Sequence, residues 1–304
     1  MRLSLAFSQS DIEVLSSHVR SYLGPLKTKS LDIGDNSYRY LEGGQGPTVI
    51  FLHGMGTSKS QSRSLLQGLT QEYHVIAPDI PGFSWGLTLP SQQRHTLRSL
   101  SKWLNLFLDQ ADIRQCHIVA HSSGSALAAY FAGYFPEKVN SMFLMALPDL
   151  KFDDDPNSTN MWDRFIEFEI KSDSDMNTLI SSFFHRTVSL PAMTSKMYIN
   201  NFKRYRESYR AVLTDLSQSA PLLYSRLSLV QCPVHFARGE HDTYCSAANL
   251  DYLSRALQNS TSTTVKETSH FFFLETPKAT VKMVIEFLSE RGVARDSLVE
   301  ATGR

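Results

Sequence analysis

The chain has 304 residues, of which 42% are hydrophobic and 20% are charged, as is typical of a globular protein large enough to bury a sizeable core. Lys and Arg together number 30, as do Asp and Glu, so the net charge gives no reason to expect a nucleic acid or an anionic membrane as the main partner. No segment approaches the apolar length of a membrane span, and the N-terminus lacks the apolar stretch of a signal peptide, so we predict a cytoplasmic protein without stable membrane insertion.

Short apolar segments alternate with amphipathic ones along most of the chain. A capped helix is expected at 10–23, and two strands with a turn near Gly34 at 26–44. Further strands are expected at 47–54, 73–79, 115–121, 139–147, 232–242 and 261–270, and further helices at 96–110, 123–135, 247–258 and 277–290. The last strand is the most polar, so we place it nearer an edge. This order indicates an α/β fold with a mainly parallel sheet covered on both faces.

The alternation breaks between Pro148 and about Pro221, where aromatic-rich helical stretches follow an acidic loop. We expect residues 1–147 and 222–293 to form the core, 148–221 a helical lid (cap) over the carboxyl edge of the sheet, and 294–304 a disordered tail. The alternative is a surface decoration that contacts no site. The aromatic content favours the lid, because large apolar side chains tend to cover something.

The segment 117–131 passes from a strand-like run into a helix-like run, with three serines at the junction: Ser122, Ser123 and Ser125. A nucleophile on a sharp strand-to-helix turn needs small residues two positions before and two positions after it. Ser122 alone meets this requirement, with Ala120 before it and Gly124 after it. Ser123 has the bulky His121 two positions before it, and Ser125 has the bulky Leu127 two positions after it. The alternative is a Ser/Gly loop without chemistry.

A serine hydroxyl is a weak nucleophile that needs a base, and the base needs an acid to orient it. On a sheet of this kind these residues follow in the order serine, acid, histidine, each after a later strand. Asp242 and His270 stand at such places. Either one alone could be structural, Asp242 as a helix cap and His270 as a packed ring. Together with Ser122 they predict a catalytic triad, with Asp149 as the rival acid.

The loop after the strand at 47–54 supplies the expected second half of an oxyanion hole. It contains His53, Gly54, Met55 and Gly56. We expect the backbone N–H groups of Met55 and Ser123 to hold the oxyanion, since the glycines allow a close approach and Ser123 begins a helix. The alternative is a plain Gly turn. We expect His53 to orient this loop and His121 to be a packed or hydrogen-bonded side chain beside the serine turn.

The cysteines and the other histidines indicate neither a metal site nor a disulfide. The cysteines, Cys116, Cys232 and Cys245, match neither a zinc pattern nor a disulfide framework, and this usage favours a reducing compartment. Three other histidines lack metal-ligand spacing: His117, His235 and His241. We predict no metal and no cofactor.

These motifs together resemble the α/β-hydrolase superfamily over roughly residues 30–290. The matching segments are "HGMG" at 53–56, "PDIPGFSWG" at 78–86, "AHSSG" at 120–124, "GEHD" at 239–242 and "SHFFFLETP" at 269–277. The resemblance implies an eight-stranded, mostly parallel sheet with a helical lid inserted after the sixth strand, and serine-nucleophile chemistry. This chain departs from the family at Ala120, where Gly is commoner, and at Ser123, where a larger apolar residue is frequent.

The leading functional prediction is a carboxylic-ester hydrolase that acts through an acyl-enzyme on a small to medium apolar substrate. The alternatives are hydrolysis of a C–C, amide or thioester bond on the same fold, or a ligand receptor with low turnover. An epoxide hydrolase or haloalkane dehalogenase is disfavoured, because that chemistry would need Asp in place of Ser122.

Substrate contacts are expected from aromatic residues beside the catalytic loops: Phe83, Trp85, Phe271 and Phe272. Each of them could equally be core packing. Lys203, Arg206 and Arg210 share one helical face, which we expect to be solvated rather than a site for acidic substrates or lipid head groups. The sequence leaves the oligomeric state open.

Overall fold

A computed structural model describes residues 24–83, 94–149, 162, 165, 170, 172–188, 192–257 and 259–302. For 192–195, 197 and 291–302 only the backbone is described. The helix expected at 10–23 lies outside the described residues.

The described residues form one eight-stranded sheet in the order β1-β2-β4-β3-β5-β6-β7-β8. The strands are β1 (Lys27–Ile33), β2 (Asn36–Gly43), β3 (Thr48–Leu52), β4 (His74–Pro78), β5 (Cys116–His121), β6 (Val139–Met145), β7 (Val234–Gly239) and β8 (Ser260–Val265). Strand β2 is antiparallel to β1 and β4, and all other neighbours pair in parallel. The predicted mostly parallel sheet is therefore confirmed, and the polar β8 lies at an edge.

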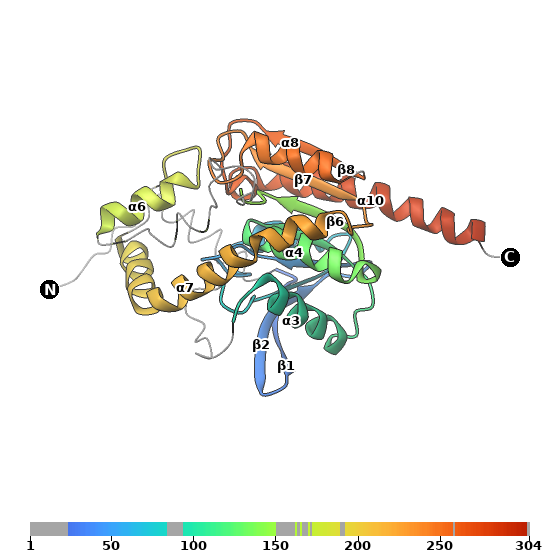
Figure 1. The fold of residues 1–304 in the computed structure, drawn as a ribbon, viewed down its shortest axis with the longest axis horizontal. Helices are drawn as coiled ribbons and strands as arrows, with labels where there is room; N and C mark the ends of the chain where they lie inside the picture. Colours follow the sequence, from blue (N-terminus) through green and yellow to red (C-terminus); the bar gives the residue numbers. More distant parts are fainter. Residues whose placement is uncertain are drawn as a thin grey trace.

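Helices cover both faces of the sheet, because alternate side chains of each strand point to opposite faces. On β3, Ile50 and Leu52 belong to one hydrophobic core, whereas Val49 and Phe51 belong to the other. The first core contains side chains of four helices, whose backbones Figure 1 shows: α3 (Leu97–Gln110), α4 (Ser123–Tyr134), α7 (Ala192–Leu227) and α8 (Ala247–Ala256). The second contains side chains of α2 (Arg63–Leu69), α9 (Phe272–Glu275) and α10 (Pro277–Thr302). A short 3₁₀ turn, η1 (Pro136–Lys138), leads from α4 to β6.

The insertion after β6 contains helix α6 (Asp173–Ser182) and the long helix α7. Ser172 and Asp175 form a reciprocal capping box that fixes the start of α6. Helix α7 extends from beside α6 to the surface of α4 (Figure 1). Its second half packs into the first core through six residues at helical spacing: Val212, Leu213, Leu216, Ala220, Leu223 and Leu227. The predicted boundary at residue 221 therefore falls inside a continuous helix.

The C-terminal helix continues to Thr302, so it includes most of the segment 294–304 for which disorder was predicted. The physical reason is local, since neither Gly nor Pro interrupts residues 293–302. Among the described helices, none has the length and apolar character that crossing a membrane requires.

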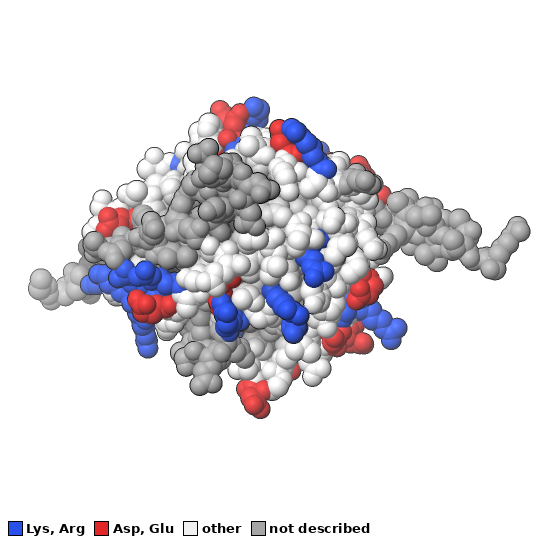
Figure 2. Space-filling view, in the orientation of Figure 1, with Lys and Arg blue, Asp and Glu red and all other residues white. Residues whose placement is uncertain are grey.

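Charges of both signs are spread over the face that Figure 2 shows, and Lys and Arg gather over the part of α7 nearest α6. In this part of the helix Lys203 and Arg210 are exposed and Arg206 is half-buried. This side of the helix therefore faces solvent, as expected for a solvated face.

Candidate active site

Ser122 occupies the turn between β5 and α4 in a strained backbone conformation. Its φ is 53° and its ψ is −126°, a combination that residues with a side chain rarely adopt. Its backbone N–H donates to the carbonyl oxygen of Met145 at 2.8 Å. A Cβ atom added at Gly124 would lie 2.3 Å from the carbonyl oxygen of Leu52. This is the steric requirement by which the sequence analysis selected Ser122.

The three residues of the predicted triad lie together in one hydrogen-bonded series. The imidazole Nε2 of His270 lies 3.0 Å from the hydroxyl oxygen of Ser122. Its Nδ1 lies 3.1 Å and 3.0 Å from the two carboxylate oxygens of Asp242. All three side chains are buried. Asp149, the rival acid, instead accepts hydrogen bonds from the backbone N–H and the hydroxyl of Ser246, at 2.8 Å and 3.1 Å.

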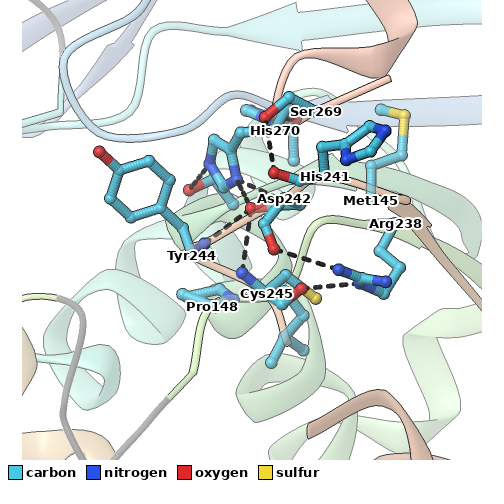
Figure 3. Close-up of polar contacts among 12 residues, drawn as sticks. Met145, Pro148, Arg238, His241, Asp242, Tyr244, Cys245, Ser269 and His270 are labelled. Carbon is cyan, nitrogen blue, oxygen red and sulfur yellow. Dashed lines mark hydrogen bonds and ion pairs between the residues drawn. The ribbon is translucent and has the colours of Figure 1, made fainter. Parts of the chain in front are cut away.

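Backbone donors and a buried arginine fix the loop that carries Asp242 (Figure 3). One carboxylate oxygen of Asp242 accepts the N–H groups of Tyr244 and Cys245, at 2.8 Å and 3.0 Å. Arg238 donates to the carbonyl oxygens of Cys245, Glu240 and Asp242, at 2.7, 3.3 and 3.1 Å. The sequence analysis did not single out Arg238, although a charged residue inside an apolar strand was a usable signal.

The thiol of Cys245 lies beside the same loop. Burial, and then the negative charge of Asp242, raise the pKa of this thiol well above its ordinary value. Cys245 therefore remains a neutral thiol near neutral pH, and its contribution to the loop is its backbone.

His53 holds the loop after β3. Its Nε2 accepts the backbone N–H of Ile80 at 2.9 Å, which places the ring proton on Nδ1. Nδ1 then donates to the carbonyl oxygen of Gly54 at 2.9 Å. Burial lowers the pKa of His53, with the charge of Asp79 opposing this shift. A neutral, doubly hydrogen-bonded ring is suited to orienting the loop, the role that the sequence analysis assigned to it.

Several backbone N–H groups beside Ser122 have no acceptor within the described part of the chain. Those of Met55 and Ser123 are among them, together with those of Gly54 and Gly124. The neighbouring N–H of Gly56 is bonded to the carbonyl oxygen of Phe83 at 2.8 Å. Ser123 begins α4, where the first N–H groups of a helix have no intrahelical partner. Met55 and Ser123 carry the two donors that the sequence analysis expected to hold an oxyanion.

His121, the residue before Ser122, supports the loop of His270. Its Nε2 donates to the carbonyl oxygen of His270 at 3.0 Å. Its ring centroid lies 4.9 Å from that of His270 and 4.8 Å from that of Phe271. Burial, and then the charge of His270, lower the pKa of His121 well below its ordinary value. His121 is therefore a neutral, buried hydrogen-bond donor.

A cavity of about 260 Å³ lies over Ser122 and His270. Met55 and Phe271 are part of its wall, and so are many side chains of the insertion, among them Trp162, Phe165, Phe183, Tyr198 and Phe202. The sequence analysis recognised this segment as aromatic-rich but could not select these residues, because the register of helices over a sheet is not encoded locally.

Two of the four expected substrate contacts need correction. Phe83 and Phe272 are fully buried in the first and second cores, and neither lines the cavity. Their apolar character serves packing between helices and sheet. Trp85 lies outside the described residues. The basic residues Lys203, Arg206 and Arg210 do not line the cavity.

Metal ligands do not gather anywhere in the part of the chain that the structure describes, where no three His, Cys, Asp or Glu side chains form a group able to hold an ion. The three cysteines are buried free thiols. The arrangement at Ser122 offers acid–base and nucleophilic chemistry from side chains alone.

A sequence profile for the alpha/beta hydrolase fold matches residues 47–277. Monoacylglycerol lipase ABHD6 of Homo sapiens is 21% identical over 262 residues, which cover 81% of this chain and 76% of that protein. The crystal structure of a membrane phospholipase A, described as a bacterial virulence factor, superposes with a TM-score of 0.81 at 22% identity, covering 93% of this chain and 92% of that one. The 2-hydroxy-6-oxo-6-phenylhexa-2,4-dienoate hydrolase of Rhodococcus sp. strain RHA1 gives a TM-score of 0.73 at 20% identity, covering 87% and 99%.

Proposed function

Because the chain belongs to the alpha/beta hydrolase fold family, we propose that it is a serine hydrolase that cleaves carboxylic esters of small to medium apolar acids. The observation that carries this proposal is the series Ser122–His270–Asp242, with hydrogen-bonding distances of 3.0 to 3.1 Å and free backbone donors beside it. The names of two relatives, a monoacylglycerol lipase and a phospholipase A, support ester hydrolysis.

The proposed reaction runs through an acyl-enzyme. The hydroxyl oxygen of Ser122 attacks the ester carbonyl carbon while Nε2 of His270 takes the hydroxyl proton. Asp242 orients the imidazole and stabilises its protonated form. The N–H groups of Met55 and Ser123 donate to the oxyanion of the tetrahedral intermediate. His270 then protonates the leaving alkoxide, and a water molecule that His270 deprotonates hydrolyses the acyl-enzyme, which restores Ser122.

The cavity supports an uncharged, apolar substrate. None of its described lining residues is Lys, Arg, Asp or Glu. A charged group in such a wall would lose its hydration without gaining a Lys, Arg, Asp or Glu partner of opposite charge. The volume of about 260 Å³ is slightly below the range of roughly 300–1,000 Å³ common for ligand pockets, which favours a short to medium chain.

Hydrolysis of a C–C bond is the same-fold alternative, and one structural neighbour is named as a dienoate hydrolase. A dienoate carries a carboxylate, which a cationic side chain in the cavity would bind most strongly. The described wall contains neither Lys nor Arg, which favours the ester over this alternative.

The proposal is tested by measuring hydrolysis of p-nitrophenyl esters of graded acyl length by the wild type and by Ser122→Ala. We expect turnover on short to medium chains and a loss of about 10⁴-fold or more in kcat for Ser122→Ala. A folded protein that hydrolyses no ester would contradict the proposal and favour a different bond or a receptor. Full activity in Ser122→Ala would exclude Ser122 as the nucleophile.

A further inference from the structure

A hydrogen bond joins the insertion to the residue that follows Ser122. The indole N–H of Trp162 donates to the hydroxyl oxygen of Ser123 at 3.0 Å. Both side chains are fully buried, and both line the cavity. Trp162 lies between β6 and α6, whereas Ser123 begins α4. The bond therefore links the cap to the turn that carries the proposed nucleophile.

This bond fixes the position of Ser123. An indole N–H buried without an acceptor is unfavourable, and so is a buried hydroxyl without a partner. Each group thus holds the other in place. The backbone N–H of the same serine has no acceptor in the described part of the chain and lies beside Ser122. A small displacement of this N–H would lengthen its hydrogen bond to an oxyanion, which depends on preorganised geometry.

The indole ring also borders the space that a substrate chain must occupy. His270 delivers a proton to the leaving alcohol, so the leaving group must lie against His270. This leaves the rest of the cavity, whose wall includes Ser123 and Trp162, for the acyl chain. A rigid buried ring at this place limits the length of the chain that the cavity accepts.

We propose that Trp162 is a positioning and specificity-determining residue, which holds Ser123 for oxyanion binding and sets the acyl-chain length. The inference rests on the proposed ester hydrolysis and extends it to the cap. The residue type matters on both sides of the bond, because a phenylalanine at 162 cannot donate and an alanine at 123 cannot accept.

The test is a double-mutant cycle of Trp162→Phe and Ser123→Ala, read as kcat and KM on a p-nitrophenyl ester series. Each single variant should lower kcat about tenfold on short esters with little change in KM, as loss of one buried hydrogen bond implies. The double variant should be no slower than the slower single variant, because both act through one bond. Trp162→Ala should move the preferred acyl chain to a greater length.

Trp103→Phe is the matched control. Trp103 is a buried tryptophan of α3 whose indole N–H has no acceptor in the described part of the chain. It does not line the cavity, so its replacement should leave kcat and the length preference unchanged.

Wild-type kcat and an unchanged length profile in Trp162→Phe and Trp162→Ala would overturn the inference. So would additive losses in the cycle. If the Trp162 variants do not fold, as judged by thermal unfolding, wild-type kcat in Ser123→Ala alone would overturn it. The proposed function is judged separately, by whether the turnover of the wild type depends on Ser122.

Discussion

Ser122 owes its backbone conformation to its surroundings. A non-glycine residue in such a conformation is disfavoured by about 1–3 kcal/mol. The turn persists because β5 and α4 are both buried and because Gly124 lies against the backbone of Leu52. The same turn leaves the hydroxyl 3.0 Å from His270. Sequence could identify this position, since the requirement for small neighbours is local and visible in Ala120 and Gly124.

The two candidate acids make a discriminating pair of variants. Asp242 contacts His270, whereas Asp149 binds Ser246 at the start of α8. We expect Asp242→Asn to lower kcat by about 10⁴-fold, because an amide can stabilise the wrong tautomer of the imidazole. Asp149→Asn should keep kcat within a few-fold of the wild type. Ester hydrolysis assays on both variants provide the measurement, and the reverse order of losses would assign the acid role to Asp149.

Arg238 is expected to place the loop of Asp242. A lysine has one ammonium group and cannot reach three carbonyl oxygens in the geometry of a guanidinium. We therefore expect Arg238→Lys to lower kcat about tenfold in addition to lowering the melting temperature, since buried carbonyls lose their partner. Arg255→Lys is the control, because that side chain is 82% exposed. A wild-type kcat with a lowered melting temperature would limit Arg238 to structural support.

At the scale of elements, helix α7 shows what sequence could not predict. The succession of strands and helices along the chain follows from apolar and amphipathic segments, which are local signals, and the edge position of β8 follows from its polarity. No local sequence signal marks the end of the insertion, because α7 runs through Pro221 without a break. The helical run on each side of Pro221 looks alike in sequence. Only packing against α4 shows that the second half belongs to the core.

Phe83 and Phe272 show that the sequence also leaves the direction of single side chains undecided. Both stand beside catalytic loops in sequence, yet each faces a core rather than the cavity. Phe271, adjacent to Phe272, does line the cavity. Neighbouring residues in a short helix or turn point in different directions, so proximity along the chain does not decide which ring meets a substrate.

Asp215 joins helix α7 to the segment before α3. Its carboxylate accepts two bonds from Arg94, at 2.8 and 2.7 Å, and the backbone N–H of His95 at 2.7 Å. Asp215→Ala should lower the free energy of unfolding by about 1–3 kcal/mol, because a buried N–H loses its acceptor. Asp251→Ala, at a side chain that is 73% exposed, should change it by less than about 0.5 kcal/mol. Urea unfolding gives both values, and equal effects would contradict this role.

For the whole molecule, buried histidines link stability to pH. Burial lowers the pKa of His53, His121 and His235, that of His235 to about 4 from 6.5. In the unfolded chain these rings regain their ordinary pKa, so below about pH 6.5 the unfolded state binds more protons than the folded state. The stability that the folded protein gains from keeping these histidines neutral is complete above about pH 6.5. It is lost progressively as the pH falls toward about 4.

We expect the free energy of unfolding to fall across that range, and His235→Gln to reduce the fall by at most about 3 kcal/mol. Denaturant unfolding at several pH values is the measurement. An identical pH dependence in His235→Gln and the wild type would show that His235 does not contribute.

The central claim is that Ser122 forms the covalent intermediate. The most direct measurement is mass spectrometry of peptides after reaction with a fluorophosphonate, which labels activated serine nucleophiles. We expect one label per chain, on Ser122, and none in the Ser122→Ala or His270→Ala variants, because the label requires both the hydroxyl and its base. A label on Ser123 or Ser125, or no label on the folded wild-type protein, would contradict it.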